Sequence, residues 1–404
     1  MNEETDSHYS WFRLGVTLLI AMIGNVGIWA IVVVLPTIQT DFGVDRAGAS
    51  MAYTTTMIGF ALGNLLIGSL VDRMGITFAM VLSAIGIAVG FAGASYVDSI
   101  SAFAFFQFIA GFFTAVGFGP LLADISQWFV KRRGMAVAIA ASGNYLSGGI
   151  WPLVLAGILE ESGWRTAYMV IALTCLFTII PLSLLLRRRV SVPFEGSAKK
   201  PGTALQGPPP FSPRQVQILL SIAGVGCCVA MSMPQVHIVA FSVDLGFGPA
   251  VGAEMLSLML FGGVVSRLIS GALADWLGGV RTIIIGSLGQ AIALFLYLPF
   301  DSLVSLYVVS LIFGLSQGGI VPSYAIVVRE YLPAKEAGAR VGLVMMATVF
   351  GMAFGGWLTG WIFDLTQSYR IGLMVGIGFN FLNLAVMTYL LLGRRPREPQ
   401  PVMA

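Results

Sequence analysis

The chain has 404 residues, of which 57% are hydrophobic and 10% are charged. Soluble domains carry about 25% charged residues, so this composition excludes an ordinary water-soluble fold and indicates that lipid surrounds much of the chain. The net charge of +3 comes from Lys and Arg scattered over several loops without a basic platform, which implies no nucleic-acid partner.

Apolar runs long enough to cross a membrane as helices, about 20 residues each, recur along the whole sequence. They predict an all-α membrane protein with twelve transmembrane helices, at residues 13–37, 50–71, 77–97, 101–126, 135–159, 166–186, 215–242, 252–274, 281–300, 304–328, 339–362 and 371–392. The polar opening segment and the absence of a small-residue cleavage pattern predict that the first helix is not a removed signal peptide.

The distribution of basic residues predicts the orientation, because Lys and Arg are retained on the cytoplasmic face. If both termini are cytoplasmic, the outer loops hold only Arg46, Arg165 and Arg370, and one further arginine, Arg267, lies inside a helix. The other 18 of the 22 basic residues then fall on the cytoplasmic side. We expect a multi-pass protein of the cell inner membrane.

A segment rich in Pro, Gly and charge divides the sequence near its middle and predicts a cytoplasmic linker at residues 187–214. The predicted domains are therefore a six-helix bundle at 1–186 and a second at 215–404. A repeated motif supports duplication: Gly68-x-Leu70-x-Asp72-Arg73-x-Gly75 recurs 203 residues later as Gly271-x-Leu273-x-Asp275-Trp276-x-Gly278.

The repeated motif predicts a gate. Its glycines permit a tight loop, and its carboxylates can pair with an arginine or with a helix N-terminus. Asp72, Arg73 and Asp275 are thus candidates for a latch whose release lets the halves rock. A static brace within the loop explains the same residues equally well.

These motifs resemble the loop signature of the major facilitator superfamily, over the whole chain. Four stretches resemble its monocarboxylate and oxalate:formate carrier branch: Trp128-Phe129-x-Lys131-Arg132-Arg133-Gly134 leading to Ser142-Gly143, Gly163-Trp164-Arg165, Pro234-x-x-His237 followed by Asp244-x-Gly246, and Arg267 with Gly271. The resemblance implies the major facilitator fold of two six-helix pseudo-repeats and a proton-coupled carrier of small organic acids, with Arg267 receiving the substrate carboxylate. Gly263 stands where animal members carry an acidic residue.

Arg267 is also the leading candidate on physical grounds alone. An arginine inside a transmembrane helix costs a few kcal/mol on insertion scales and is usually functional. Its guanidinium matches the geometry of a carboxylate. The alternative is a structural role, but a direct pair with Asp275 is disfavoured because eight residues of helix span ~12 Å.

Two groups near the outer end of the seventh predicted helix are candidates for proton coupling. Asp244 lies one to two helical turns beyond His237, where partial burial favours protonation. The alternative is an exposed acid beside a lone hydrogen-bonded histidine. Asp124, the other acid near a helix, is expected to pair with Arg132 and Arg133 in the loop that follows it.

Several polar side chains interrupt apolar segments, and lipid cannot satisfy them, so they should face the bundle interior. They can line a substrate cavity or bond one helix to another; the set is Asn25, Tyr53, Asn144, Tyr145, Gln317 and Tyr324. The three cysteines lie within predicted helices, and no metal site or cofactor motif is present.

The sequence therefore predicts a secondary active transporter of small monocarboxylates and not an enzyme. Its expected partners are a small organic acid, a proton and membrane lipid, and we expect a monomer that works by alternating access. A proton-coupled antiporter of drugs or other hydrophobic solutes with the same fold is the second hypothesis. A non-transporting membrane receptor or sensor is the third.

Overall fold

The computed structural model describes residues 5–188, 211–332 and 337–393, and the side chains of 68–70, 72, 133 and 337–339 lie outside that description. Most of the predicted linker at 187–214 is likewise outside the described residues. The first half contains α1 (His8–Gly24), α2 (Val26–Phe42), α3 (Arg46–Met74), α4 (Ile76–Tyr96), α5 (Ile100–Thr114), α6 (Gly119–Ser126) and α7 (Arg133–Leu184). The second contains α8 (Pro213–Asp244), α9 (Pro249–Leu277), α10 (Gly279–Leu296), α11 (Leu303–Gln317), α12 (Ile320–Tyr331), α13 (Ala337–Thr366) and α14 (Tyr369–Leu392).

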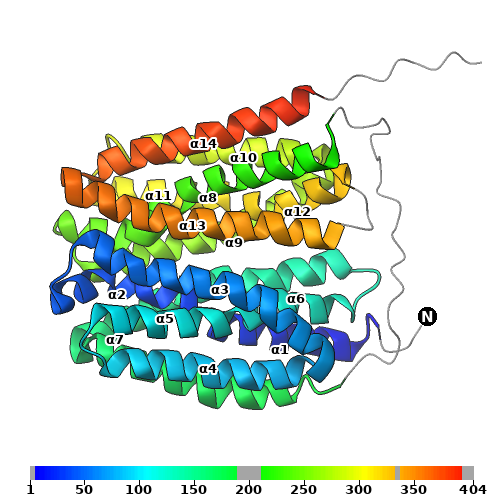
Figure 1. Ribbon diagram of the computed structural model, residues 1–404, viewed down its shortest axis with the longest axis horizontal. Helices are drawn as coiled ribbons and strands as arrows, with labels where there is room; N and C mark the ends of the chain where they lie inside the picture. The colour runs from blue at the N-terminus through cyan, green and yellow to red at the C-terminus, as the bar shows by residue number, and fades with distance from the viewer. Residues whose placement is uncertain (1–4, 189–210, 333–336, 394–404) are drawn as a thin grey trace, which may run out of the picture.

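The helices form two groups that lie side by side with their axes roughly parallel. Helices α1 to α7 occupy the lower half of Figure 1 and α8 to α14 the upper half. We call these groups the first half and the second half. They meet where α3 packs on α13 and α7 packs on α9.

The two ends of the bundle need separate names. α1 begins and α14 finishes at the end on the right of Figure 1, which we call the terminal end. The opposite end, where α2 turns into α3 and α13 turns into α14, is the far end.

The second half repeats the geometry of the first. α3 and α9 are each 29 residues long, and α9 begins 203 residues after α3. Gly75 ends α3 with φ 88° and ψ 163°, and its counterpart Gly278 ends α9 with φ 83° and ψ 163°. α5 and α11, each of 15 residues, begin with the same offset. The repeated sequence motif therefore forms the same backbone turn twice.

Several helices are interrupted where the sequence predicts continuous spans. The predicted helix at 13–37 extends from His8 to Phe42 and breaks at Asn25, whose side chain donates to the carbonyls of Ala21 at 2.7 Å and Gly117 at 3.2 Å. The predicted span at 101–126 breaks at a short 3-10 turn, after which Pro120 lies in the first turn of α6. Proline is tolerated in a first helical turn because no hydrogen-bond donor is needed there.

The described residues contain eleven helical segments long and apolar enough to cross a membrane, compared with the twelve predicted. The difference arises because the predicted helices at 135–159 and 166–186 join in α7, a helix of 52 residues. Gly163, with φ 78° and ψ 169°, is non-helical within α7. A straight helix of that length would extend ~78 Å, well beyond a bilayer.

Candidate functional site

Arg267 lies in α9 at the contact between the two halves. Its Nη1 donates to the carbonyl of Ala141 in α7 at 2.6 Å, and its Nε donates to the carbonyl of Gly318 at 3.3 Å. The guanidinium carbon lies 4.2 Å from the centre of the Tyr145 ring. Arg267 thus joins the second half to α7 through a carbonyl and an aromatic face.

No carboxylate pairs with Arg267 among the residues that the structure describes. Carbonyl dipoles and an aromatic quadrupole stabilise a guanidinium, but they carry no net charge to neutralise it. Gly263 lies on the same helix and faces the Tyr145 ring: a Cβ added at this glycine would lie 3.5 Å from the ring. The guanidinium of Arg267 is therefore left without a carboxylate counter-ion among the described residues.

Two of the polar residues predicted to line a substrate cavity are the sequence neighbours of residues that contact Arg267. Asn144 precedes Tyr145 and accepts from the Trp29 indole through its backbone oxygen at 3.0 Å and its Oδ1 at 3.2 Å. Gln317 precedes Gly318 and accepts from Gln235 at 2.8 Å. Sequence reasoning missed Gln235, which adjoins Pro234 in a helix whose motif drew attention only to His237.

The remaining predicted substrate residues lie elsewhere in the interior. Asn25 is buried at the break between α1 and α2. Tyr324 is buried within the second half, where it donates to Asn383 at 2.9 Å. Tyr53 in α3 packs against Gly356 of α13. These three positions favour helix-to-helix bonding over direct contact with a ligand at Arg267.

His237 is buried beneath the far end. Its Nε2 lies 2.8 Å from the carbonyl oxygen of Gly356, and its Nδ1 has no hydrogen-bond partner among the described residues. A cavity of about 20 Å³ borders the ring and is also lined by Met233, Thr359 and Tyr369. The surface of this cavity is apolar, and a buried water is retained only where it has two to four polar partners, so the cavity by itself indicates no water site.

Asp244 ends α8 and forms a two-pronged ion pair with Arg46, with N···O distances of 3.1 and 3.2 Å. The sequence placed Arg46 in an outer loop and did not connect the two residues. Because 198 residues separate them, nothing in the local pattern indicates that the pair forms.

The predicted gating residues at the terminal end are only partly described. Arg73 and Asp275 are exposed. No ion pair to either one occurs in the described ranges, and the side chain of Asp72 lies outside them. The gating role of all three stays a prediction.

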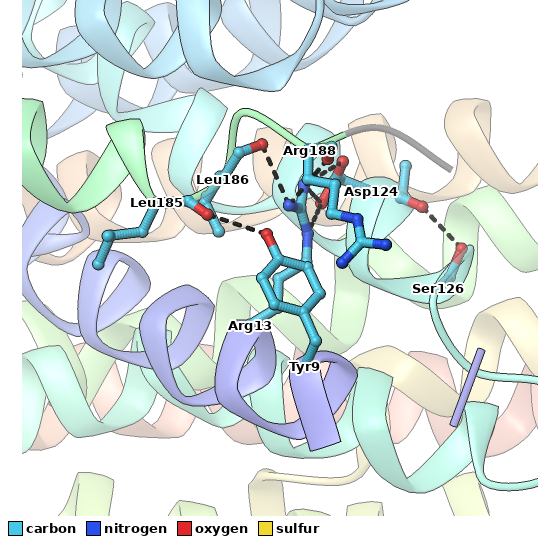
Figure 2. A network of polar contacts seen from close by, with 8 residues as sticks. Tyr9, Arg13, Asp124, Ser126, Leu185, Leu186 and Arg188 are labelled. Carbon is cyan, nitrogen blue, oxygen red and sulfur yellow. Dashed lines mark hydrogen bonds and ion pairs between the residues drawn. The ribbon is translucent and has the colours of Figure 1, made fainter. Parts of the chain in front are cut away.

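Asp124 pairs with Arg13 and not with Arg132 as predicted, and the side chain of Arg133 lies outside the described residues. Figure 2 shows Asp124 bound to Arg13 of α1, with the closest contact at 2.8 Å. Arg13 also donates to the carbonyls of Leu186 and Arg188, each at 3.1 Å. α1 crosses α6 at this point, so a residue 111 positions away reaches Asp124 before the adjoining loop does.

A cavity of about 830 Å³ opens beside this pair at the terminal end. The described residues that line it belong to the first half, from α1, α3, α4, α6 and α7, and none of the predicted substrate residues is among them. In the described part of the chain, no group of three His, Cys, Asp or Glu side chains could hold a metal ion.

Comparison with known proteins assigns the family. The sequence profile of the Major Facilitator Superfamily matches residues 17–313 and 218–403. The chain belongs to this superfamily; it is a multi-pass membrane transporter and not an enzyme.

Known relatives within the superfamily include a monocarboxylate transporter. Monocarboxylate transporter 13 of Bos taurus is 27% identical over 270 residues, which cover 66% of this chain and 62% of that protein's length. MFS-type transporter 1 of an Ophiocordyceps species is 25% identical over 313 residues, covering 76% and 68%. The resemblance to monocarboxylate carriers predicted from the sequence is confirmed at this level.

The fold also resembles solved transporters. A bacterial homologue of the human lysosomal transporter Spinster, in an inward-facing and unoccupied conformation, superposes with a TM-score of 0.73 at 15% identity. The comparison covers 97% of this chain and 99% of the other. At that identity the likeness concerns the fold alone.

Proposed function

We propose that this protein carries small organic anions with one carboxylate across the inner membrane, in symport with a proton and by alternating access. The observation that carries the proposal is Arg267, an arginine within a transmembrane helix, at the contact between the halves, that has no acidic partner in the described residues. A monocarboxylate supplies one negative charge and two oxygens, which match one guanidinium.

The proposed binding step replaces the contact between Arg267 and Ala141. The substrate carboxylate accepts the hydrogen bond that Arg267 donates to the Ala141 carbonyl in this structure. The Tyr145 ring keeps the guanidinium in position during this exchange. Asn144 and Gln317 lie next to these contacts and are proposed to orient the acid. Asn25, Tyr53 and Tyr324 are proposed to set the helix packing around it.

We propose that Asp244 and His237, which have separate partners in this structure, carry the proton. Protonation of Asp244 removes the charge that holds Arg46, and His237, whose Nδ1 has no hydrogen-bond partner among the described residues, is the second candidate for the proton. Both positions lie at the far end, which is the outer end if both termini are cytoplasmic as the loop charges predict. Counting α7 as two crossings separated at Gly163 gives the twelve spans this topology requires.

Uptake by purified protein in proteoliposomes tests the proposal. We expect an inward proton gradient to accelerate uptake of labelled lactate, pyruvate or benzoate, and Arg267→Gln to abolish it. Arg165→Gln, which changes an outer arginine far from the site, should transport normally. Uptake that ignores the gradient for every acid would refute proton symport.

The antiporter of drugs or hydrophobic solutes remains the second candidate. One observation favours it: apolar side chains lie at the contact between the halves near Arg267. Trp29 and Leu260 pack against Gly148, and Phe261 packs against Gly149. Such a surface suits an apolar solute. The same vesicles would then exchange neutral or cationic aromatics against protons and show no uptake of acids. A receptor or sensor would bind ligand in them without flux.

A further inference from the structure

Arg46 is the centre of a contact that joins the two halves at the far end. It is the first residue of α3, and its side chain is only 6% exposed despite its charge. Its guanidinium binds both oxygens of Asp244 from the second half, and its Nε donates to Gln39 of α2 at 2.5 Å. A buried arginine saturated in this way is held in one geometry.

Aromatic side chains from the second half enclose the same guanidinium. Its central carbon lies 4.6 Å from the ring centre of Phe363 and 5.7 Å from that of Tyr369. The Tyr369 hydroxyl also accepts a hydrogen bond from Nη1 of Arg46. The charge is therefore removed from water by residues of α13 and α14.

The backbone of α3 is bound across the halves as well. The two carboxylate oxygens of Asp364, in α13, accept from the backbone N–H groups of Arg46 at 2.9 Å and Ala47 at 2.7 Å. These groups belong to the first turn of α3, where helical donors lack partners within the helix. Asp45 caps the same turn from within the first half by accepting from Gly48.

Contacts between α3 and α13 continue below this point towards the interior. Gly360 lets α13 approach the Arg46 backbone and Ser50 closely, and Thr54 donates to the carbonyl of Ala353 at 3.0 Å. The other ion pairs described at this end each lie within one half: Arg165 binds Asp41 and Asp98 in the first half, and Arg370 binds Asp301 in the second. Those pairs can persist when the halves separate.

We propose that Arg46 and Asp364 form the latch that closes the far end of the transport path, Arg46 through its side chain to Asp244 and Asp364 through its cap on α3. Opening this end requires the α3 N-terminus to leave Asp364 and Arg46 to leave Asp244 in one step. The proposal rests on alternating access, as proposed above, and holds for any substrate.

Accessibility from outside the cell of a cysteine placed at half-buried Thr54 tests the latch. In a variant with all three native cysteines replaced by alanine, Thr54→Cys places a thiol about 12 Å, eight helical residues, below Arg46. A membrane-impermeant, charged methanethiosulfonate is added to intact cells without substrate. Glu161→Cys, an exposed residue beside the Gly163 break at the same end, reports that the reagent reaches this face.

We expect Arg46→Gln and Asp364→Asn each to raise the labelling rate of the introduced thiol by about tenfold or more, the change that 1.4 kcal/mol of lost closure produces. Arg165→Gln should leave the rate unchanged. If Arg46→Gln does not fold, Tyr369→Phe, which removes only a hydroxyl, should still raise it. Unchanged labelling in the latch variants, or an equal rise in Arg165→Gln, would overturn the latch.

Transport measured in parallel separates this proposal from the proposed function. A latch variant that is labelled faster but still requires Arg267 for acid uptake supports both. Faster labelling in a protein that carries no acid supports the latch alone, because labelling needs no substrate.

Discussion

At the scale of the residue, Arg267 is the side chain on which the proposed function depends most. The sequence indicates that an arginine within a transmembrane helix needs a reason to be there. The structure adds its neighbours, which are two carbonyls and the Tyr145 ring. A guanidinium with these partners is positioned but not neutralised.

Replacing the aromatic ring beneath Arg267 tests how the guanidinium is positioned. Tyr145→Leu removes the cation–π contact, worth about 1 kcal/mol, and should raise the apparent KM for acid uptake about fivefold. Tyr145→Phe keeps the ring and should stay close to wild type. A phenylalanine variant as impaired as the leucine variant would show that the hydroxyl, not the ring, is what matters.

Whether a site residue can be recognised from the sequence depends on how far along the chain its partners lie. Arg267 stands out in the sequence because a charge in an apolar segment is visible locally. Arg46 and Asp364 were not, because each lies at a predicted helix end, where charges are common, and the partner is about 318 residues away. Asp124 was assigned to a neighbouring loop for the same reason.

At the scale of the element, glycines that end α3 and α9 fix the repeated turn. Both adopt φ near +85° with ψ of 163°, a region that residues with a Cβ occupy only with strain. Gly75→Ala and Gly278→Ala should each lower the free energy of unfolding by about 1–3 kcal/mol, measured by thermal unfolding in detergent. Gly157→Ala is the control, since its added methyl meets no atom within 4 Å; an equal loss there would contradict the account.

The pair between α1 and α6 should be structural. Asp124→Asn leaves the buried Arg13 without a carboxylate and should cost about 3 kcal/mol of stability, seen as a lower unfolding temperature. Asp98→Asn, at an exposed pair with Arg165, should have no measurable effect. If the two variants unfold at the same temperature, the buried pair of Arg13 and Asp124 contributes no more to stability than the exposed pair does.

The sequence predicted where most helices lie, because a transmembrane run is set by local hydrophobicity, and it predicted the duplication from one short motif. It did not predict the breaks at Asn25 and between α5 and α6. Those depend on an asparagine bonding to a neighbouring helix and on a proline that begins a new turn, features that hydropathy averages away.

At the scale of the whole molecule, the two halves touch through the latch at the far end and through Arg267 further inside. Proton and substrate are proposed to act at these separate contacts. Asp244→Asn should therefore make uptake insensitive to the proton gradient while equilibrium exchange of labelled for unlabelled acid persists. Loss of both, in a folded protein, would place Asp244 outside the coupling step.

The most direct test of the central claim is acid binding at Arg267. Purified wild type, Arg267→Gln, Arg267→Lys and Arg165→Gln are heated with lactate, pyruvate or benzoate, and the unfolding temperature is recorded. A ligand at about 100 times its Kd stabilises by ~2.7 kcal/mol, so we predict a rise for wild type and Arg165→Gln, a smaller one for Arg267→Lys, and none for Arg267→Gln. Acids that stabilise Arg267→Gln as much as wild type, or that stabilise neither, would contradict the claim that this arginine receives the substrate carboxylate.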